Sequence, residues 1–279
     1  MMSKITFGYI IGGDDSHYEN LLRSLRSLER IEQDHEILIL DADGRLGAPE
    51  GQDNVRIIHY PVQEGKGGDW YKPHIWQMRY HLYEYLETDY CFYLDSDTVI
   101  VNDRVDDLIK YSEDKFLICP HWWLNDIKDY FTKVRVSAKS IHPYLNAGNA
   151  YQRYIASGVF LFKRGVHDKI FKTFSEMFDA IFADGQCPAG ITDELLLGLS
   201  LFKEGDYKFA HGSMNHSSNH NQMPLKYTKG NFYGKNPDDD KFQKVFLFHN
   251  DIKEFYTSDI TNGLTPKTIR ELEKVCYIK

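Results

Sequence analysis

The stretch CFYLDSDTVIVND, from Cys91 to Asp103, decides the fold of this chain. Its apolar, strand-like start runs into Asp95-Ser96-Asp97, after which a second β-rich run begins. In open α/β sheets, ligands bind beyond the carboxyl ends of the strands. Two carboxylates two residues apart would repel each other there unless a cation lies beside them. Oxygen ligands suit Mg²⁺ or Mn²⁺, so the stretch predicts a metal site; the alternative is a turn in which an Asp caps a helix.

The region before this stretch alternates between strand and helix signals. Three short apolar, β-rich runs are predicted to be strands: Ile5–Ile11, Glu36–Leu40 and Val55–Tyr60. Ser16 and Glu19 form a capping box that predicts the start of a helix, and a second helix is expected over 72–86. The order strand, helix, strand, strand, helix, strand favours an α/β fold with a mostly parallel sheet covered by helices.

The region after the stretch is more irregular. Four further runs are predicted to be strands: Phe116–Pro120, Tyr154–Phe162, Lys208–His211 and Lys244–Asn250. Helices are expected over 168–182 and 192–203, and a last one from Thr265-Pro266. A polar, Gly- and Asn-rich segment over 211–240 is expected to be a long functional loop. Because no linker divides the chain, we expect a single domain over 1–279.

Composition narrows the function classes. The 279 residues carry a net charge of −8, from 41 acidic and 33 basic residues, which disfavours binding to nucleic acid. No run of about 18 apolar residues is present, so no transmembrane segment is expected. The N-terminus lacks a signal-peptide pattern, and Cys91 and Cys119 lie in apolar runs as free cysteines usually do. A cytoplasmic location is the expectation.

Several motifs, taken together and in order, resemble those of nucleotide-sugar-dependent glycosyltransferases with the GT-A fold. They are the strand followed by D-x-D at Asp95–Asp97, the Lys72-Pro73 pair before an aromatic helix, the S-G-V-F strand at Ser157–Phe160, the D-E element at Asp193-Glu194, and the late Phe248-His249-Asn250. The resemblance implies a Rossmann-like, mostly parallel sheet with a smaller antiparallel portion. It also implies a nucleotide-binding half over 1–103 and a donor-sugar and acceptor half over 104–279.

The resemblance further implies a role for each matching residue. Asp97 and His249 would bind Mn²⁺ or Mg²⁺, and Asp95 would share the metal or touch the ribose. Contacts to a UDP-sugar donor are implied for Tyr9, Ile10 and Ile11 around the uridine, Lys72 on the diphosphate or sugar, Asp95 with Ser96, and Ser157 with Gly158 beside the sugar. Asp193 or Glu194 would act at the anomeric centre or on sugar hydroxyls.

The implied activity is metal-dependent transfer of glucose or galactose from a UDP-sugar to an unknown glycan or protein acceptor, with retention of configuration. Two alternatives stay open: a metal-dependent nucleotidyltransferase and a non-catalytic protein that binds sugar nucleotides. Each residue also has a purely structural explanation. Lys72 could be a solvated lysine, Ser157-Gly158 a bulge, Asp193-Glu194 helix-stabilising charges, and His249 a strand-end histidine.

Other polar clusters compete with this site. Asp41-Ala42-Asp43 is a second D-x-D that a turn explains, with Asp41 as a minor candidate for a nucleoside contact. His211, His216 and His220 match no familiar zinc spacing but could bind an acceptor. Gly65–Gly68 is expected to be a mobile loop over the donor, and Asp238–Asp240 a solvated turn.

Overall fold

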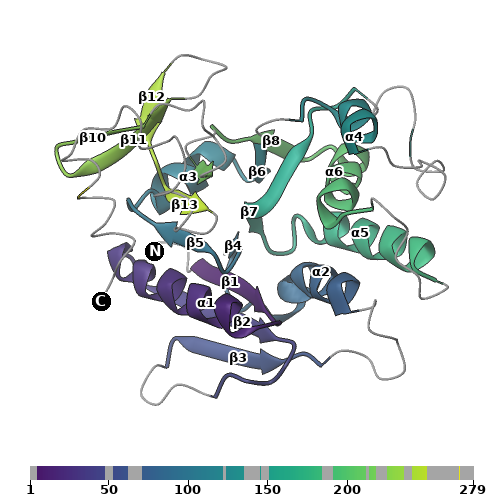
Figure 1. Cartoon of the computed structure of the whole chain (residues 1–279), viewed down its shortest axis with the longest axis horizontal. Helices are drawn as coiled ribbons and strands as arrows, with labels where there is room; N and C mark the ends of the chain where they lie inside the picture. The colour runs from purple at the N-terminus through teal and green to yellow at the C-terminus, as the bar shows by residue number, and fades with distance from the viewer. Residues whose placement is uncertain are drawn as a thin grey trace.

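The computed structural model describes residues 5–47, 53–61, 71–121, 124–134, 145, 151–183, 191–211, 214–217, 225–235, 241–249 and 270. Its centre is a seven-stranded sheet with the strand order β3-β2-β1-β4-β7-β6-β8 (Figure 1). The strands are β1 Ile5–Ile11, β2 His35–Asp41, β3 Val55–His59, β4 Tyr90–Leu94, β6 Phe116–Pro120, β7 Ile155–Lys163 and β8 Tyr207–Phe209. The strands expected from the sequence are all present, with ends that differ by a few residues.

Six of these strands run in one direction and β7 runs against them. β1 pairs in parallel with β2 and β4, β2 with β3, and β6 with β8, whereas β7 pairs antiparallel with both β4 and β6. The carboxyl ends of the six strands therefore meet the amino end of β7 at one edge of the sheet. This edge is where ligands bind in open α/β sheets.

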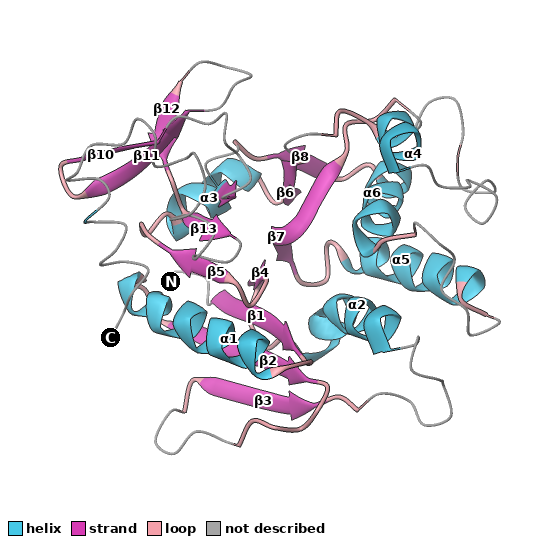
Figure 2. Ribbon diagram, in the orientation of Figure 1, coloured by secondary structure: helices cyan, strands magenta, loops and turns pink. Residues whose placement is uncertain are grey.

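Helices cover both faces of the sheet (Figure 2). The helices are α1 Asp15–Ser27, α2 Tyr71–His81, α3 Val105–Ser112, α4 Ile127–Val134, α5 Asp168–Ile181 and α6 Asp193–Glu204, with short 3₁₀ turns over Leu28–Arg30 and Leu82–Tyr85. One buried cluster joins the sheet to α1 and α3, and another joins it to α2, α4, α5 and α6. Within the described ranges, every helix is too short or too polar to span a bilayer.

Successive side chains of β1 point to opposite faces of the sheet, so this one strand contributes residues to both buried clusters. Tyr9 and Ile11 point toward α1, whereas Ile10 points toward α2. All three side chains are buried, as expected for a strand covered by helices on both faces.

Two small sheets complete the fold, one antiparallel throughout and one mixed. One has the order β10-β11-β12, with bounds Leu225–Thr228, Asn231–Lys235 and Phe242–Lys244. The other has the order β5-β13-β9, with bounds Thr98–Ile100, Leu247–His249 and Asn215–Ser217. The expectation of a loop over 211–240 is therefore wrong for β9, β10 and β11.

Local details correct further expectations. Helix α1 is capped by Asp14, whose Oδ1 accepts hydrogen bonds from the backbone N–H groups of Ser16 (3.0 Å) and His17 (3.4 Å), so Ser16 is not its cap. The helix expected over 72–86 ends as an α-helix at His81. Helices α3 and α4 had no predicted counterpart, and the helix expected from Thr265-Pro266 lies outside the described residues.

Candidate functional site

Three side chains that could bind a metal meet at the carboxyl edge of the sheet. Asp95 directly follows β4 and Asp97 directly precedes β5, while His249 ends β13. Because β13 pairs with β5 so that His249 lies opposite Thr98, the imidazole comes beside both carboxylates. Nε2 of His249 lies 3.5 Å from Oδ2 of Asp95 and 3.3 Å from Oδ1 of Asp97. One ligand atom from each residue falls within 4.8 Å of the others, so the three can share one ion.

Charge is concentrated at this cluster. Burial disfavours a protonated His249, but the carboxylates of Asp97 and Asp95 outweigh burial and raise its pKa to about 10. Burial also disfavours an ionised Asp95, yet the guanidinium of Arg79 and the His249 ring lower its pKa to about 2. A ring nitrogen facing two carboxylates thus attracts positive charge, and a divalent cation would compete with the proton for that place.

The donor set and its surroundings fit a divalent cation. Carboxylate oxygens and an imidazole nitrogen suit Mn²⁺, and carboxylates suit Mg²⁺. The other ring nitrogen of His249, Nδ1, lies 3.1 Å from Oδ1 of Asn215 on β9. An Nδ1–H bond to this amide oxygen leaves the lone pair on Nε2, which faces the two Asp residues, as second-shell partners of metal-binding His residues commonly do.

Gly158 lets β7 pass directly behind Asp95 and His249. Its carbonyl oxygen accepts a hydrogen bond of 2.8 Å from the backbone N–H of Asp95. A Cβ at Gly158 would lie 2.1 Å from Cε1 of His249 and 2.6 Å from Oδ2 of Asp95. Only glycine therefore fits this position while the two side chains keep their places.

A buried arginine links the three residues Asp95, Asp97 and His249, here called the ligand cluster, to the start of α6. Nη2 of Arg79 donates to Oδ1 of Asp95 at 3.0 Å, and Nη1 donates to Oγ of Ser157 at 2.6 Å and to Oδ2 of Asp193. The guanidinium also lies 4.7 Å from the ring centre of Tyr93. Sequence analysis missed Arg79, because its partners lie 16, 78 and 114 residues away in the chain and no local motif marks it.

The two carboxylates that open α6 have different surroundings. The helix is capped by Oγ1 of Thr192, which accepts from the backbone N–H of Leu195 at 3.2 Å, as predicted. Asp193 is paired with Arg79 and also accepts from Oγ of Ser157 at 3.2 Å. Glu194 accepts only from the backbone N–H of Ser157, at 3.2 Å, among the described residues. Burial, together with the charge of Asp193, raises the pKa of Glu194 to about 8.

The remaining predicted donor contacts lie around this edge. Tyr9 is buried under α1, where its hydroxyl lies 3.0 Å from Oγ of Ser24, and the Ile10 and Ile11 side chains lie in the core. Their place in a uridine pocket stays a prediction. Ser96 lies half-buried between the two Asp ligands. Lys72 lies in the first turn of α2, and its side chain is outside the described atoms.

The competing clusters have local explanations or fall outside the described residues. Oδ1 of Asp41 accepts from the Tyr18 hydroxyl (2.8 Å) and the Asp43 backbone N–H (3.1 Å), and Oδ2 accepts from the Leu46 backbone N–H (2.8 Å), so this D-x-D forms a turn. His211 follows β8, and His216 lies on β9 with an undescribed side chain. The segments and residues outside the described ranges are Gly65–Gly68, His220 and Asp238–Asp240.

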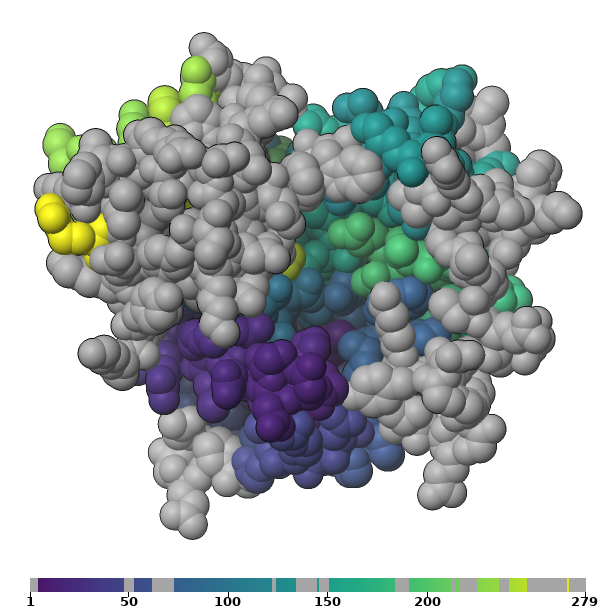
Figure 3. Space-filling model, in the orientation of Figure 1, coloured from purple at the N-terminus to yellow at the C-terminus, as the bar shows by residue number. Residues whose placement is uncertain are grey.

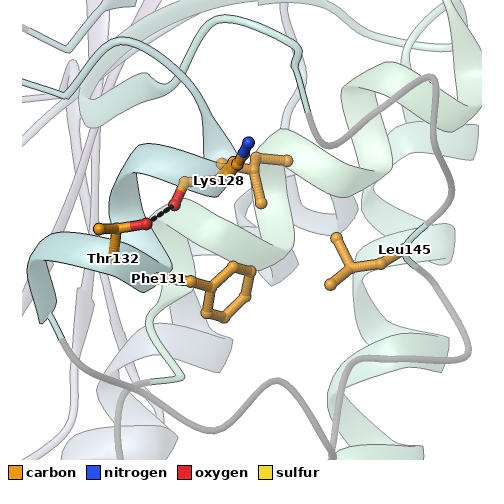
Figure 4. A pocket seen from close by; sticks show the side chains of 5 residues that line it. Lys128, Phe131, Thr132 and Leu145 are labelled. Atoms are coloured by element: carbon orange, nitrogen blue, oxygen red, sulfur yellow. Dashed lines mark hydrogen bonds between the residues drawn. The ribbon is translucent and has the colours of Figure 1, made fainter.

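The described surface has a central hollow and a separate pocket. Figure 3 shows a hollow at the centre of the molecular face, where blue, green and yellow segments meet. A separate pocket of about 270 Å³ lies beside α4, where Phe131 and Leu145 line its walls and Oγ1 of Thr132 donates to the Lys128 carbonyl (Figure 4). None of its lining residues belongs to the ligand cluster, so it is not a candidate for the chemistry.

Solved structures of one enzyme resemble this chain over nearly its full length. The galactosyltransferase LgtC, solved in complex with donor and acceptor sugar analogs, matches with a TM-score of 0.57 and 18% identity, over 96% of this chain and 99% of that one. An active-site mutant of LgtC matches with a TM-score of 0.55 and 16% identity, over the same shares. No protein-family model and no curated protein matches the sequence. At this identity the likeness shows the fold, which is the GT-A fold.

Proposed function

We propose that this GT-A-fold chain is a metal-dependent glycosyltransferase that moves glucose or galactose from a UDP-sugar to a glycan or protein acceptor, with retention of configuration. The observation that carries the proposal is the cluster of Asp95, Asp97 and His249 at the carboxyl edge of the sheet. Bound there, Mn²⁺ or Mg²⁺ would offset the charge that the diphosphate gains as it leaves. The similarity to a galactosyltransferase supports a hexose donor.

The donor is proposed to lie across the carboxyl ends of β1 and β4. The end of β1, at Tyr9, Ile10 and Ile11, would border the uridine, and Ser96 would lie beside the ribose. Lys72 would add a positive charge near the diphosphate. These contacts follow the order of the elements along the sheet edge, where ligands bind in such folds.

Glu194 is the carboxylate we assign to the reacting carbon. Asp193 is already neutralised by Arg79, whereas Glu194 has no ion pair within the described part of the chain. As the bond between the anomeric carbon and the phosphate oxygen breaks, positive charge develops on the sugar. Glu194 would stabilise that charge in its ionised form, which predominates only above its pKa of about 8. The acceptor hydroxyl then bonds to the carbon, and its proton passes to the departing diphosphate. Retention is supported by the D-E element that follows the Ser157-Gly158 strand in the chain.

We also propose how the chain is organised. It would act as one unit over 1–279, with the nucleotide in the 1–103 half and the sugar and acceptor in the 104–279 half. The ion pair of Arg79 with Asp193 joins these two halves at the site. A cytoplasmic location is supported by Cys91 and Cys119, which are buried as free thiols.

Two other classes compete with this proposal. A nucleotidyltransferase would transfer the nucleotide rather than the sugar, and a binding protein would leave the donor intact. The late ligand His249 favours the glycosyltransferase over the nucleotidyltransferase. In an assay with a UDP-sugar labelled in the sugar, a glycosyltransferase passes the label to an acceptor or to water, a nucleotidyltransferase leaves it on a sugar phosphate, and a binding protein leaves the donor intact.

The test is donor consumption with and without metal. UDP-glucose and UDP-galactose are incubated with Mn²⁺ and free UDP is measured, for the wild type, for Asp97→Ala and for Asp114→Asn. Asp114 is a matched control, because it pairs with Lys163 beside Tyr90 at the amino end of β4. We expect Asp97→Ala to lose about 10²-fold or more and Asp114→Asn to keep full activity. Undiminished turnover in excess EDTA would overturn the proposal.

A further inference from the structure

A second pocket lies at the same edge of the sheet as the ligand cluster. It has a volume of about 420 Å³ and lies between α3, the end of β8 and β12, within the range of about 300–1,000 Å³ typical of small-molecule sites. Its lining includes Arg104, Tyr111, Arg153, Phe209, His211 and Gln243. None of these residues belongs to the metal and sugar site described above.

Two segments connect this pocket to the metal ligands. Met214 lines the pocket, and the next residue, Asn215, holds Nδ1 of His249. Arg153 precedes β7, and along this strand the half-exposed Ala156 and then Gly158 follow on one face. At about 3.3 Å per residue, Arg153 lies roughly 16 Å from Gly158. The pocket is therefore a few sugar units away from the reacting carbon.

The pocket combines cations with aromatic rings. The guanidinium of Arg153 lies 5.9 Å from the ring centre of Phe209, and Tyr111 is 45% exposed at the rim. Nη1 of Arg104 donates to the Lys244 carbonyl, and its Nε lies 4.0 Å from the exposed carboxylate of Asp107. Among the described residues that line the pocket, two carry a guanidinium group and one carries a carboxylate, in a chain of net charge −8. Planar guanidinium groups recognise carboxylates and phosphates, and a nearby ring suits the apolar face of a sugar.

We infer that this pocket binds an anionic group, a carboxylate or a phosphate, on a sugar unit of the acceptor. The inference rests on the proposed function, since it names the acceptor class of that same site. Arg153 would hold the anion directly, with Phe209 and Tyr111 beside the sugar ring. Anionic glycans would then be preferred over neutral ones of the same size.

The test measures sugar binding while the donor site is filled. With saturating UDP and Mg²⁺, which is diamagnetic, ligand-detected NMR titrations compare glucuronate, glucose 6-phosphate and glucose. We expect at least one anionic sugar to bind about tenfold more tightly than glucose, the preference that one charge-assisted hydrogen bond provides. If only glucuronate binds more tightly than glucose, the pocket recognises a carboxylate. If only glucose 6-phosphate does, the pocket recognises a phosphate. Equal affinity for all three overturns the inference.

Two variants test whether the anionic sugar binds in this pocket. Arg153→Gln should remove the preference for the anionic sugar and leave glucose unchanged, and Gln243→Glu should do the same by adding a negative charge to the pocket. Arg56→Gln is the matched control, because Arg56 lies on β3 and pairs with Glu87. If Arg153→Gln and Gln243→Glu both keep the wild-type preference, the anion binds elsewhere. Donor consumption without acceptor is measured in parallel, so that failure of the proposed function is recognised separately.

Discussion

Replacing Gly158 by alanine tests the geometry of the metal site most directly. The added Cβ would lie 2.1 Å from Cε1 and 2.9 Å from Nε2 of His249, and 2.6 Å from Oδ2 of Asp95. Ordinary contacts of this kind begin near 3.4 Å, so His249 has to move by roughly 1 Å or β7 has to shift. Both ligands are thus displaced by one methyl group that carries no charge.

The size of the effect follows from the precision that metal sites need. Ligand distances hold to within about 0.2 Å, and disturbing only the partners of metal ligands already costs about 10–100-fold in affinity. Displacing two ligands should weaken Mn²⁺ binding by about 100-fold or more. Overpacking should also lower the free energy of unfolding by about 1–3 kcal/mol.

The assay is a calorimetric Mn²⁺ titration of the wild type, Gly158→Ala and Gly198→Ala. Gly198 is the matched control, because it is buried in α6 and a Cβ there would lie 3.5 Å from Cγ1 of Ile155 and 3.8 Å from Cε2 of Phe202. A methyl at ordinary contact distance in a helix should be neutral or slightly stabilising. Donor consumption is followed on the same samples.

The reasoning is refuted if Gly158→Ala binds Mn²⁺ with wild-type affinity. The cluster of Asp95, Asp97 and His249 would then not be the metal site. Equal loss in Gly198→Ala would also refute it, because the effect would come from the helix and strand packing and not from contact with the ligands.

Three further predictions concern buried charges. Arg79→Gln leaves Asp193 and Asp95 without their buried partner and should lower the free energy of unfolding, measured in urea titrations, by about 3–5 kcal/mol. The control Arg56→Gln, at the surface, should change it by less than about 1 kcal/mol. Equal effects of the two variants would contradict the ion-pair argument. Glu194→Gln should reduce donor turnover by about 10²-fold, while its affinity for UDP stays within a few-fold of the wild type. NMR of the product formed by the wild type should show a retained anomeric configuration, and an inverted product would disprove retention. Burial lowers the pKa of His167 from 6.5 to about 4, so between these pH values unfolding takes up a proton, and the free energy of unfolding falls by about 3 kcal/mol as the pH drops from 6.5 toward 4. The variant His167→Asn should lose this share of the pH dependence, while its side chain can still accept from the Lys163 backbone N–H, as Nδ1 of His167 does at 2.8 Å. An unchanged pH dependence would show that His167 does not cause it.

The central sheet and the ligand cluster could be predicted from local signals. Apolar runs such as Ile5–Ile11 coincide with strands because a sheet covered on both faces needs apolar residues throughout. The D-x-D lies where β4 ends, and Asp97 and His249, which were expected to bind one metal ion, lie 3.3 Å apart. Thr192 caps α6 as its sequence indicates.

Other features depend on contacts that sequence patterns do not encode. Arg79 looks like any polar residue of an aromatic helix, and only the folded chain brings it to Asp95, Ser157 and Asp193. Strands β10 and β11 lie in the segment over 211–240 that was expected to be a loop, because this segment is polar and rich in Gly and Asn. Asp14 caps α1 in place of Ser16 because its Oδ1 accepts hydrogen bonds from the backbone N–H groups of Ser16 and His17.

The insertion of β13 between β5 and β9 has a consequence for biosynthesis. Some 150 residues separate Asp97 from His249, and at about 5–20 residues per second they leave the ribosome roughly 8–30 s apart. During that interval the nascent chain has both carboxylates but no imidazole to complete the set. A polypeptide released before residue 249 would therefore contain the whole seven-stranded sheet but lack the imidazole of the proposed metal site.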